Sequence, residues 1–414
     1  MKLSKFGQKI TSHSGILDLM DDLGKAMASN DNVAMLGGGN PAHIPEVINL
    51  LQDELQNLSK DKSWVSDGLA TYNTPRGNDR FLNALAEYIN SKFKWNISPE
   101  NLVVTPGSQA GFFMLFNMIA GVDENGVNRQ IHLPIEPEYI GYFDQGITKD
   151  MFKTHQPKIH KIGEHEFKYE VDLDNFKLDD HAAAICISRP TNPTGNVISK
   201  DEIDRLREIA DNQNIPFILD NAYGLPFPAV IDDQEPIEWS ESLIYSMSLS
   251  KVGLPAVRNG VIIANKETAS LLSSANAIVS LANPNIGQML MTPLLESGQI
   301  DQIVRDIIQP YYANKATYAK QVIEATFGDD FPWRLHSHQG SFFFWLWLEN
   351  LPISTKQLYQ NLKKKGVVVV PGEYFFLDDS WEHSRQCLRL NIARPESEID
   401  AGIKILKQAI VESI

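Results

Sequence analysis

The stretch Ser246–Arg258 reads Ser-Met-Ser-Leu-Ser-Lys-Val-Gly-Leu-Pro-Ala-Val-Arg and follows a short apolar segment that is typical of a buried strand. A lysine where a core strand meets a Gly/Pro turn is unusual, because burying an ammonium group is costly unless it is paired or neutralised. Desolvation lowers the pKa of a lysine, and the neutral amine is a nucleophile suited to Schiff-base chemistry. Lys251 is therefore the candidate catalytic residue, with a surface lysine in a turn as the alternative. Ser248, Ser250 and Arg258 would supply hydroxyl donors and a positive charge for an anionic group, most simply a phosphate.

The composition is that of an ordinary globular protein. The chain has 414 residues, of which 43% are hydrophobic and 21% are charged, and a prior of roughly 100–200 residues per domain suggests two or three domains. The formal net charge of -15 disfavours nucleic acids and anionic membranes as partners. No apolar run approaches the roughly 20 residues that span a bilayer, and the first residues lack the apolar core of a secretion signal.

The positions of the cysteine and histidine residues bear on the cellular compartment and on metal binding. Cys186 and Cys387 each lie in an apolar, strand-like run, where we expect small buried side chains in a reducing compartment. We therefore expect a cytoplasmic protein. His336 and His338 have no acidic or thiol companions at the spacing of metal ligands, so we expect no metal site.

Three further motifs follow strand-like segments. Asn-Pro-Thr-Gly at 192–195 forms a turn by its own chemistry. Asp-Asn-Ala-Tyr at 220–223 places a carboxylate at the carboxyl end of an apolar run, where α/β folds bind ligands. Pro-Gly-Ser-Gln at 106–109 joins a strand to a helix whose N-terminus would attract a phosphate. Together with the lysine stretch, these motifs resemble the aspartate-aminotransferase-like family of pyridoxal-phosphate enzymes (class I/II, fold type I), and the resemblance runs in chain order from Gly39 to Arg389.

The resemblance implies an α/β fold of the fold type I aminotransferases. We expect a large domain with a mostly parallel central sheet flanked by helices, and a smaller α+β domain formed by the N- and C-terminal parts. The near-continuous apolar run at 183–188 supports a parallel sheet that is covered on both faces. We expect the small domain to contain 1–48 and 287–414, the latter starting with a long helical stretch at 288–327. The large domain, which binds pyridoxal phosphate, would span 49–286.

The resemblance also implies pyridoxal 5'-phosphate as the cofactor. Lys251 would carry it covalently, Asp220 would keep its pyridine nitrogen protonated, and Tyr139 would stack on its ring. The segment from Lys251 to Arg258 is one residue shorter than the family's usual pattern. The other cofactor contacts that the resemblance implies are Gly107, Ser108, Gln109, Asn192, Tyr223, Ser248 and Arg258.

Three substrate contacts and one contact between subunits follow from the same resemblance. The backbone of Gly39 would lie against the substrate carboxylate, a close approach that leaves no room for a Cβ. Asn192 would bond the same carboxylate. Arg389 is a charge inside a strand of hydrophobic residues and needs a partner; the family uses it to bind the α-carboxylate, and a structural salt bridge is the alternative. Tyr72 would cross the interface of a homodimer to reach the cofactor phosphate of the neighbouring subunit.

The implied reaction is transamination between amino acids and 2-oxo acids by a ping-pong Schiff-base mechanism. No second basic residue stands out as a partner for a side-chain carboxylate, and Phe342, Phe343 and Phe344 indicate an apolar lining. The nearer alternatives use the same fold: a β C–S lyase, or an aminotransferase for aromatic or methionine-type substrates. A non-catalytic, ligand-sensing role, as in pyridoxal-phosphate-binding transcription regulators, is the more distant alternative.

Overall fold

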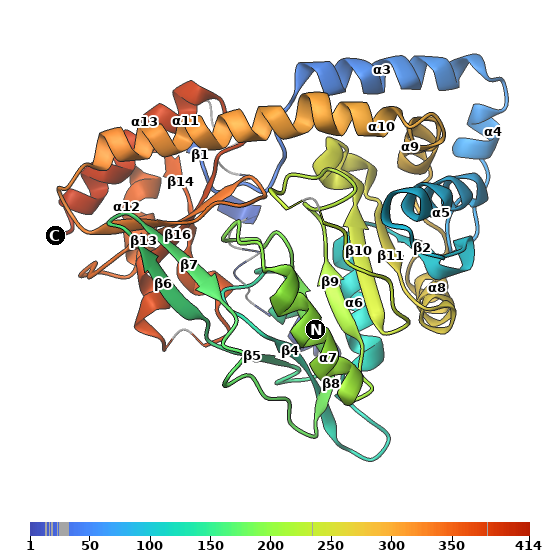
Figure 1. Cartoon of the computed structure of the whole chain (residues 1–414), viewed down its shortest axis with the longest axis horizontal. Coiled ribbons are helices and arrows are strands. Elements are labelled where there is room, and N and C mark those ends of the chain that lie inside the picture. The colour runs from blue at the N-terminus through green and yellow to red at the C-terminus, as the bar shows by residue number, and fades with distance from the viewer. Residues whose placement is uncertain are drawn as a thin grey trace.

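The computed structural model describes residues 1–12, 15, 17, 20–22, 24, 33–233, 235–378 and 380–414. Part of the N-terminal segment predicted for the small domain therefore lies outside the described residues. The chain forms two large sheets joined by a long helical run (Figure 1). None of the described helices is long and apolar enough to cross a membrane.

The larger sheet has eight strands. Across the sheet these are β2 (Leu102–Thr105), β11 (Gly260–Ile263), β10 (Leu243–Ser248), β9 (Phe217–Asp220), β8 (Ala182–Ser188), β4 (Asn128–Leu133) and β3 (Gly121–Val122), with β5 (Phe152–Thr154) also paired with β4. The central strands β4, β8, β9 and β10 are parallel, whereas β11 is antiparallel to both of its neighbours. The predicted mostly parallel central sheet is confirmed.

Both faces of this sheet are buried, as the continuous apolar strands require. Side chains alternate between faces along a strand, and on β8 Ile185 and Ile187 belong to one hydrophobic cluster while Ala184 and Cys186 belong to the other. Residues of α6 (Ser108–Ile119) and α8 (Lys266–Ser280) complete the second cluster. The first cluster contains residues of the helices on the opposite face, which are α5 (Asp79–Phe93), α7 (Lys200–Asn212) and α9 (Ile286–Glu296).

The second sheet has six strands. In order these are β15 (Val370–Pro371), β16 (Cys387–Asn391), β13 (Phe343–Leu348), β12 (Trp333–His336), β7 (Glu166–Glu170) and β6 (Lys158–Ile162). A separate parallel pair joins β1 (Ala34–Met35) to β14 (Val367–Val368). This pair brings the N- and C-terminal parts of the chain together, as expected for the smaller domain.

One hairpin departs from the segment limits expected from the sequence. Residues 158–170 lie within the range 49–286 assigned to the large domain, yet β7 pairs in parallel with β12 of the second sheet. The partner strand β6 satisfies one edge of β7, and β12 satisfies the other. An alternating strand pattern carries no information about which sheet the strand will join, because either sheet can satisfy the same backbone groups.

A long helical run spans the molecule next to both sheets. It consists of α10 (Gln299–Gln302), a π-helical segment (Ile303–Ile308) and α11 (Gln309–Phe327). The helical stretch predicted at 288–327 is divided between α9 and this run, because the chain leaves the helix at Ser297 and Gly298. In Figure 1 this orange run lies beside α3 (Pro45–Lys60). At one end Tyr88 of α5 donates a 2.6 Å hydrogen bond to Asp301, and near the other end Tyr318 donates one of 2.7 Å to Asp400.

The remaining described helices are short or flank the second sheet. They are α1 (Lys5–Ile10), α4 (Trp64–Gly68), α12 (Thr355–Lys364) and α13 (Glu396–Val411). Short 3-10 turns occupy Pro99–Asn101, Phe143–Gln145, Leu249–Val252, Pro255–Val257, Gly372–Phe375 and Glu382–Gln386. Two of these turns, Leu249–Val252 and Pro255–Val257, follow β10 directly and carry the lysine stretch.

Candidate active site

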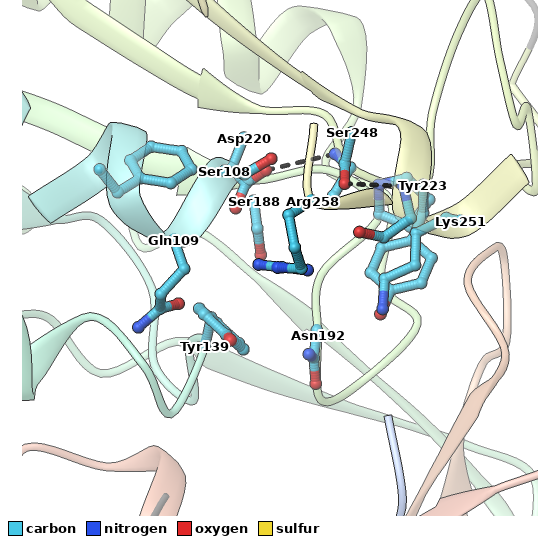
Figure 2. Close-up of a pocket in the computed structure, with 14 residues that line it drawn as sticks. Ser108, Gln109, Tyr139, Ser188, Asn192, Asp220, Tyr223, Ser248, Lys251 and Arg258 are labelled. Atoms are coloured by element: carbon cyan, nitrogen blue, oxygen red, sulfur yellow. Dashed lines mark hydrogen bonds between the residues drawn. The ribbon is translucent and has the colours of Figure 1, made fainter. Parts of the chain in front are cut away.

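A cavity opens at the carboxyl ends of the central parallel strands, the place where α/β sheets bind ligands. Ser188, Asp220 and Ser248 are the last residues of β8, β9 and β10, and all three line it. The cavity contains about 670 Å³ of space, part of it open to solvent. Its other lining residues are Ser108, Gln109, Phe112, Tyr139, Pro190, Asn192, Ala222, Tyr223, Ser250, Lys251 and Arg258, and Figure 2 shows most of them pointing into the same space.

Lys251 lies on the 3-10 turn that follows β10. Its Nζ donates a 2.9 Å hydrogen bond to the carbonyl oxygen of Gly39 and lies 5.2 Å from the ring centroid of Tyr223 and 5.4 Å from that of Phe342. Burial and, second to it, the positive charge of Arg389 together lower the pKa of Lys251 to about 8. The predicted shift toward a neutral amine is therefore present, and it makes the amine available as a nucleophile or base.

Asp220 presents its carboxyl group to the same cavity. Tyr142 donates a 2.6 Å hydrogen bond to Oδ2, and the backbone N–H of Ala222 donates one of 3.2 Å to Oδ1. Burial raises the pKa of Asp220 to about 6, although the bond from Tyr142 acts in the opposite direction. A cationic group in the cavity would favour the ionised carboxylate, so Asp220 is suited to hold a protonated ring nitrogen.

The N-terminus of α6 and Arg258 form an anion-binding corner. Gly107 precedes the helix with φ of 85°, and a Cβ at this position would clash with the guanidinium group of Arg258. Among the described residues no carboxylate lies within salt-bridge distance of Arg258, whose Nη1 donates 3.2 Å to the carbonyl of Pro255. The hydroxyls of Ser108 and Ser248 border the same corner. A helix N-terminus, two hydroxyls and an arginine without an acidic partner fit a phosphate group.

Tyr139 and Tyr223 line the cavity with aromatic rings. The ring of Tyr139 packs edge-on against Tyr142 with centroids 5.3 Å apart, and a Cβ on Gly141 would lie 2.5 Å from it. Burial raises the pKa of both Tyr139 and Tyr223, so both hydroxyls remain protonated and able to donate. Gln109 lies beside Tyr139 in Figure 2. This arrangement has a flat aromatic face for a ring and hydroxyl donors for its oxygen atoms.

Arg389 is a buried cation on β16. Its Nη1 donates 2.8 Å to Oδ1 of Asn192, its Nη2 donates 2.7 Å to the carbonyl of Gly37, and its Nε has no hydrogen-bond partner. Its guanidinium carbon lies 4.2 Å from the ring centroid of Phe343. Burial lowers the pKa of Arg389 to about 10. Within the described residues it forms no ion pair, so the alternative of a structural salt bridge finds no support, and the orphaned donor fits an incoming carboxylate.

A second cavity of about 1220 Å³, including open solvent, adjoins the first. Lys251, Asn192 and Tyr139 line both cavities, and Gly39 and Arg389 line the second. The fold therefore brings together the residues predicted to contact the cofactor and those predicted to contact the substrate.

Tyr72 is the exception. Its side chain is 81% exposed and is absent from the lining of either cavity. It lies in the loop between α4 and α5. Within one copy of the chain it does not reach the site, and its predicted role depends on a second copy.

Sequence reasoning did not single out Phe112, Ser188, Pro190 and Ala222 as lining residues of the cofactor cavity, nor Tyr142, which contacts the lining residue Asp220. Tyr142 bonds Asp220, and it belongs to the motif Pro-Glu-Tyr-Ile-Gly-Tyr at 137–142, which gives no hint of that contact. Ser188 lines the cavity and could have been found, because it ends an apolar strand run just as Asp220 does.

Two expectations about the substrate side need correction. Phe342, Phe343 and Phe344 do not form one apolar wall: Phe342 borders the amine of Lys251 without lining either cavity, Phe343 packs on Arg389, and Phe344 packs on His338 with ring centroids 5.1 Å apart. Consecutive residues at a strand point to opposite faces, so three phenylalanines in a row cannot form one wall. A second basic residue, Arg394, does line the second cavity. It lies beyond the strand that carries Arg389, and no motif marked it.

Comparisons with known proteins agree with this geometry. A family profile described as aminotransferase class I and II matches residues 32–406. The chain is 40% identical over 415 residues to valine–pyruvate aminotransferase of Escherichia coli K12, covering 99% of this chain and 98% of that protein. The crystal structure of an amino-acid aminotransferase from Psychrobacter arcticum 273-4 has a TM-score of 0.96 and 41% identity, covering 100% and 99% of the two chains. Valine–pyruvate aminotransferase from Salmonella typhimurium LT2 has a TM-score of 0.88 and 38% identity, covering 96% of this chain and 99% of that one.

Proposed function

The chain belongs to the class I and II aminotransferases and is a pyridoxal-phosphate-dependent transaminase, and from this premise we propose that it transfers the amino group of L-valine to pyruvate. The products would be 2-oxoisovalerate and L-alanine. The observation that carries the proposal is the full-length similarity to valine–pyruvate aminotransferase of Escherichia coli. The segments Leu-Gly-Gly-Gly-Asn-Pro-Ala at 36–42 and Met-Ser-Leu-Ser-Lys at 247–251 resemble that enzyme too.

Pyridoxal phosphate, when bound, supplies an electron sink that stabilises negative charge on the substrate Cα. We assign its attachment to Lys251, its ring nitrogen to Asp220 and its ring face to Tyr139. Its phosphate would bind at the anion-binding corner, and its ring oxygen would accept from Asn192 and Tyr223. The phosphate contacts are Gly107, Ser108, Gln109, Ser248 and Arg258. The assignment is supported by the fit of the side chains: an acid lies at the ring position, and hydroxyl and guanidinium donors lie at the corner.

The substrate α-carboxylate would bind at Arg389, with Asn192 and the backbone of Gly39 beside it. This is supported by the unsatisfied Nε of a buried arginine, which gains a charged partner when a carboxylate arrives. An arginine fork binds a carboxylate through two parallel hydrogen bonds and fixes its orientation. Arg389 would thereby present the substrate Cα to the side of the cavity where Lys251 lies.

Lys251 would move the proton at the substrate Cα. A general base works best when its pKa lies near the working pH, and the lowered pKa of about 8 brings Lys251 close to that range. The rings of Tyr223 and Phe342 exclude water from the amine on one side. Because both amino acids and both 2-oxo acids use the same cavity in turn, we expect ping-pong kinetics.

We also propose that the active unit is a homodimer with Tyr72 at the interface. Exposed apolar side chains gather on α4, on the Tyr72 loop and on α8, and large apolar patches on a surface mark interaction sites. Asn276 of α8 donates a 2.7 Å hydrogen bond to the carbonyl of Pro75, so the loop and the helix are neighbours. The patch consists of Val65, Leu69, Tyr72, Leu271, Ile278, Val279 and Leu281.

The expected location is the cytoplasm. Cys186 and Cys387 are both buried and free, which suits a reducing compartment.

The test is incubation of the purified protein with L-valine and pyruvate, followed by an assay for L-alanine. Alanine formed in step with loss of valine supports the proposal. An absence of alanine together with steady release of pyruvate from cystathionine would instead favour a β C–S lyase. Faster turnover of aromatic or methionine-type amino acids would favour the other aminotransferases of the same fold.

A further inference from the structure

The second cavity has a wall of its own beyond Arg389. This wall contains the apolar side chains of Met20, Met35 and Ile140 and the guanidinium group of Arg394. Because Arg389 and Lys251 line the same cavity as these residues, a substrate held by its carboxylate at Arg389 would have this space open to its side chain. Arg394 is therefore a cation facing the region that recognises the substrate side chain.

Arg394 is held in an ion pair by Glu398, which lies in the first turn of α13. Its Nε lies 3.2 Å from both carboxylate oxygens, and its Nη2 lies 3.1 Å from Oε2. The Glu398 side chain is only 16% exposed, against 32% for Arg394. Glu398 also accepts a 2.5 Å hydrogen bond from the backbone N–H of Met35 on β1. The carboxylate is thus fixed from two sides, independently of any ligand.

We propose that Glu398 is a specificity-determining residue, which holds Arg394 in an ion pair and makes the cavity accept uncharged amino acids in preference to dicarboxylic ones. The inference rests on the proposed transamination at this site. An arginine readily binds a carboxylate through two parallel hydrogen bonds. With Glu398 in place the Nε and Nη2 edge of the guanidinium group is already occupied, and a second carboxylate that enters the cavity would meet two opposite charges that cancel.

Discrimination between substrates often depends on a repulsive element as well as an attractive one. Here Glu398 supplies the unfavourable part for a dicarboxylic substrate in two ways. It occupies the guanidinium group of Arg394, and it adds a negative charge next to the cavity. The apolar residues Met20, Met35 and Ile140 supply the attractive part for an aliphatic side chain.

Glu398→Gln tests this directly. Glutamine keeps the size of the side chain and can still accept from Met35, but it removes the charge that neutralises Arg394. We expect the ratio of kcat/KM for L-glutamate to kcat/KM for L-valine to rise about tenfold or more, the scale of one charge-assisted hydrogen bond. The double variant Glu398→Gln/Arg394→Met removes the released cation and should lose this gain. Half-reactions followed by the absorbance of the bound cofactor give both constants.

Arg394→Gln should change the glutamate-to-valine ratio of kcat/KM in the opposite direction. It leaves Glu398 without its cation at the cavity wall, so the glutamate-to-valine ratio should fall below that of the wild-type protein. A ratio that stays constant in Glu398→Gln and in Arg394→Gln, while both substrates slow together, would overturn the proposal and leave a purely structural ion pair. If the wild-type protein fails to convert valine, the proposed function fails. The ratio of glutamate to another neutral donor, L-alanine, then still tests the ion pair.

Discussion

The cofactor cavity and the substrate cavity share a border at Lys251 but are built differently. The first is assembled at the ends of adjacent parallel strands: Ser188 and Asp220 are register partners, and Ser248 lies two residues beyond Ser246, the partner of Asp220 on β10. The second combines β1, the loop after it, the β16 strand and the residues up to Arg394, which lie at opposite ends of the chain. The cofactor side therefore depends on one sheet, and the substrate side depends on the docking of distant segments.

Because the two cavities are built differently, we expect substitutions in the cofactor cavity and in the substrate cavity to have different effects on activity. A change at the strand ends should remove the chemistry for every substrate. A change on the far wall should alter which substrates are accepted.

Lys251→Ala should have the largest effect. Removing the base and covalent anchor should lower alanine formation from valine and pyruvate by about 10⁴-fold, at the upper end of what a positioned general base contributes. The purified variant should also lose the yellow colour of the covalently bound cofactor on dialysis against an amino acid. Lys149→Ala, at a side chain that is 91% exposed, is the matched control. A Lys251→Ala variant that keeps a tenth of wild-type activity would contradict the assignment of Lys251 as the base and the point of cofactor attachment.

Arg389→Lys should have the next largest effect. The lysine keeps the positive charge but loses the planar fork, so kcat/KM for L-valine should fall about 100-fold through the loss of one or two charge-assisted hydrogen bonds. Isobutylamine, which lacks the carboxylate, serves as the comparison substrate and should be affected far less. An equal loss for both amines would mean that Arg389 supports the fold and does not bind the carboxylate.

Ile278→Asp should test the contribution of a second copy to the cofactor side. Ile278 is 89% exposed in one copy, and a charge in an apolar interface is costly. We expect the mass in solution to fall from dimer to monomer, and the affinity for pyridoxal phosphate to fall about tenfold as the Tyr72 contact is lost. Val411→Asp, on α13, is the matched control. A monomeric variant with unchanged cofactor affinity would exclude the role of Tyr72 across the interface.

The pH dependence of aldehyde addition should give the smallest effect. In cofactor-free protein the rate of reaction with pyridoxal should rise with pH through about 8, because the pKa of Lys251 is lowered to about 8 and the neutral amine reacts. The positive charge of Arg389 contributes to this lowering, so Arg389→Met should raise the pKa and move the profile to higher pH. Arg305→Met, at an exposed site, should leave the profile in place. A profile that Arg389→Met does not move would contradict the electrostatic link between the two cavities.

Much of the fold and of the cofactor side could be predicted from the sequence. Strands at 102–105 and 183–188 are continuous apolar runs, and their ends carry the polar residues that line the cavity. Asp220 could be selected because its position at a strand end has a physical meaning by itself. Lys251 could be selected because burying the ammonium group of a lysine next to a core strand is unfavourable unless the group is paired or neutralised.

The substrate side was predicted less well, for a physical reason. Arg394 faces the cavity through tertiary docking, and its immediate neighbours in the sequence show neither a strand end nor a phosphate turn. The β6–β7 hairpin was not identified from the sequence; it lies within the range 49–286 but pairs with β12 of the second sheet, because the backbone groups of a strand can be satisfied by either sheet. Short motifs therefore predict the residues that take part in local chemistry. They do not predict which distant segments pack together, because that depends on tertiary contacts.

The helical run from α10 to α11 contacts both halves of the molecule. Its 4, 6 and 19 residues give a length of about 40 Å at about 1.5 Å per residue. One end is tied to α5 through Asp301 and the other to α13 through Tyr318, and the hydroxyl of Tyr312 between them accepts a hydrogen bond from the backbone N–H of Ala42. Because this one helical run contacts both halves, the placement of α13, the helix that carries Glu398, depends on contacts that are made in the half that holds Lys251.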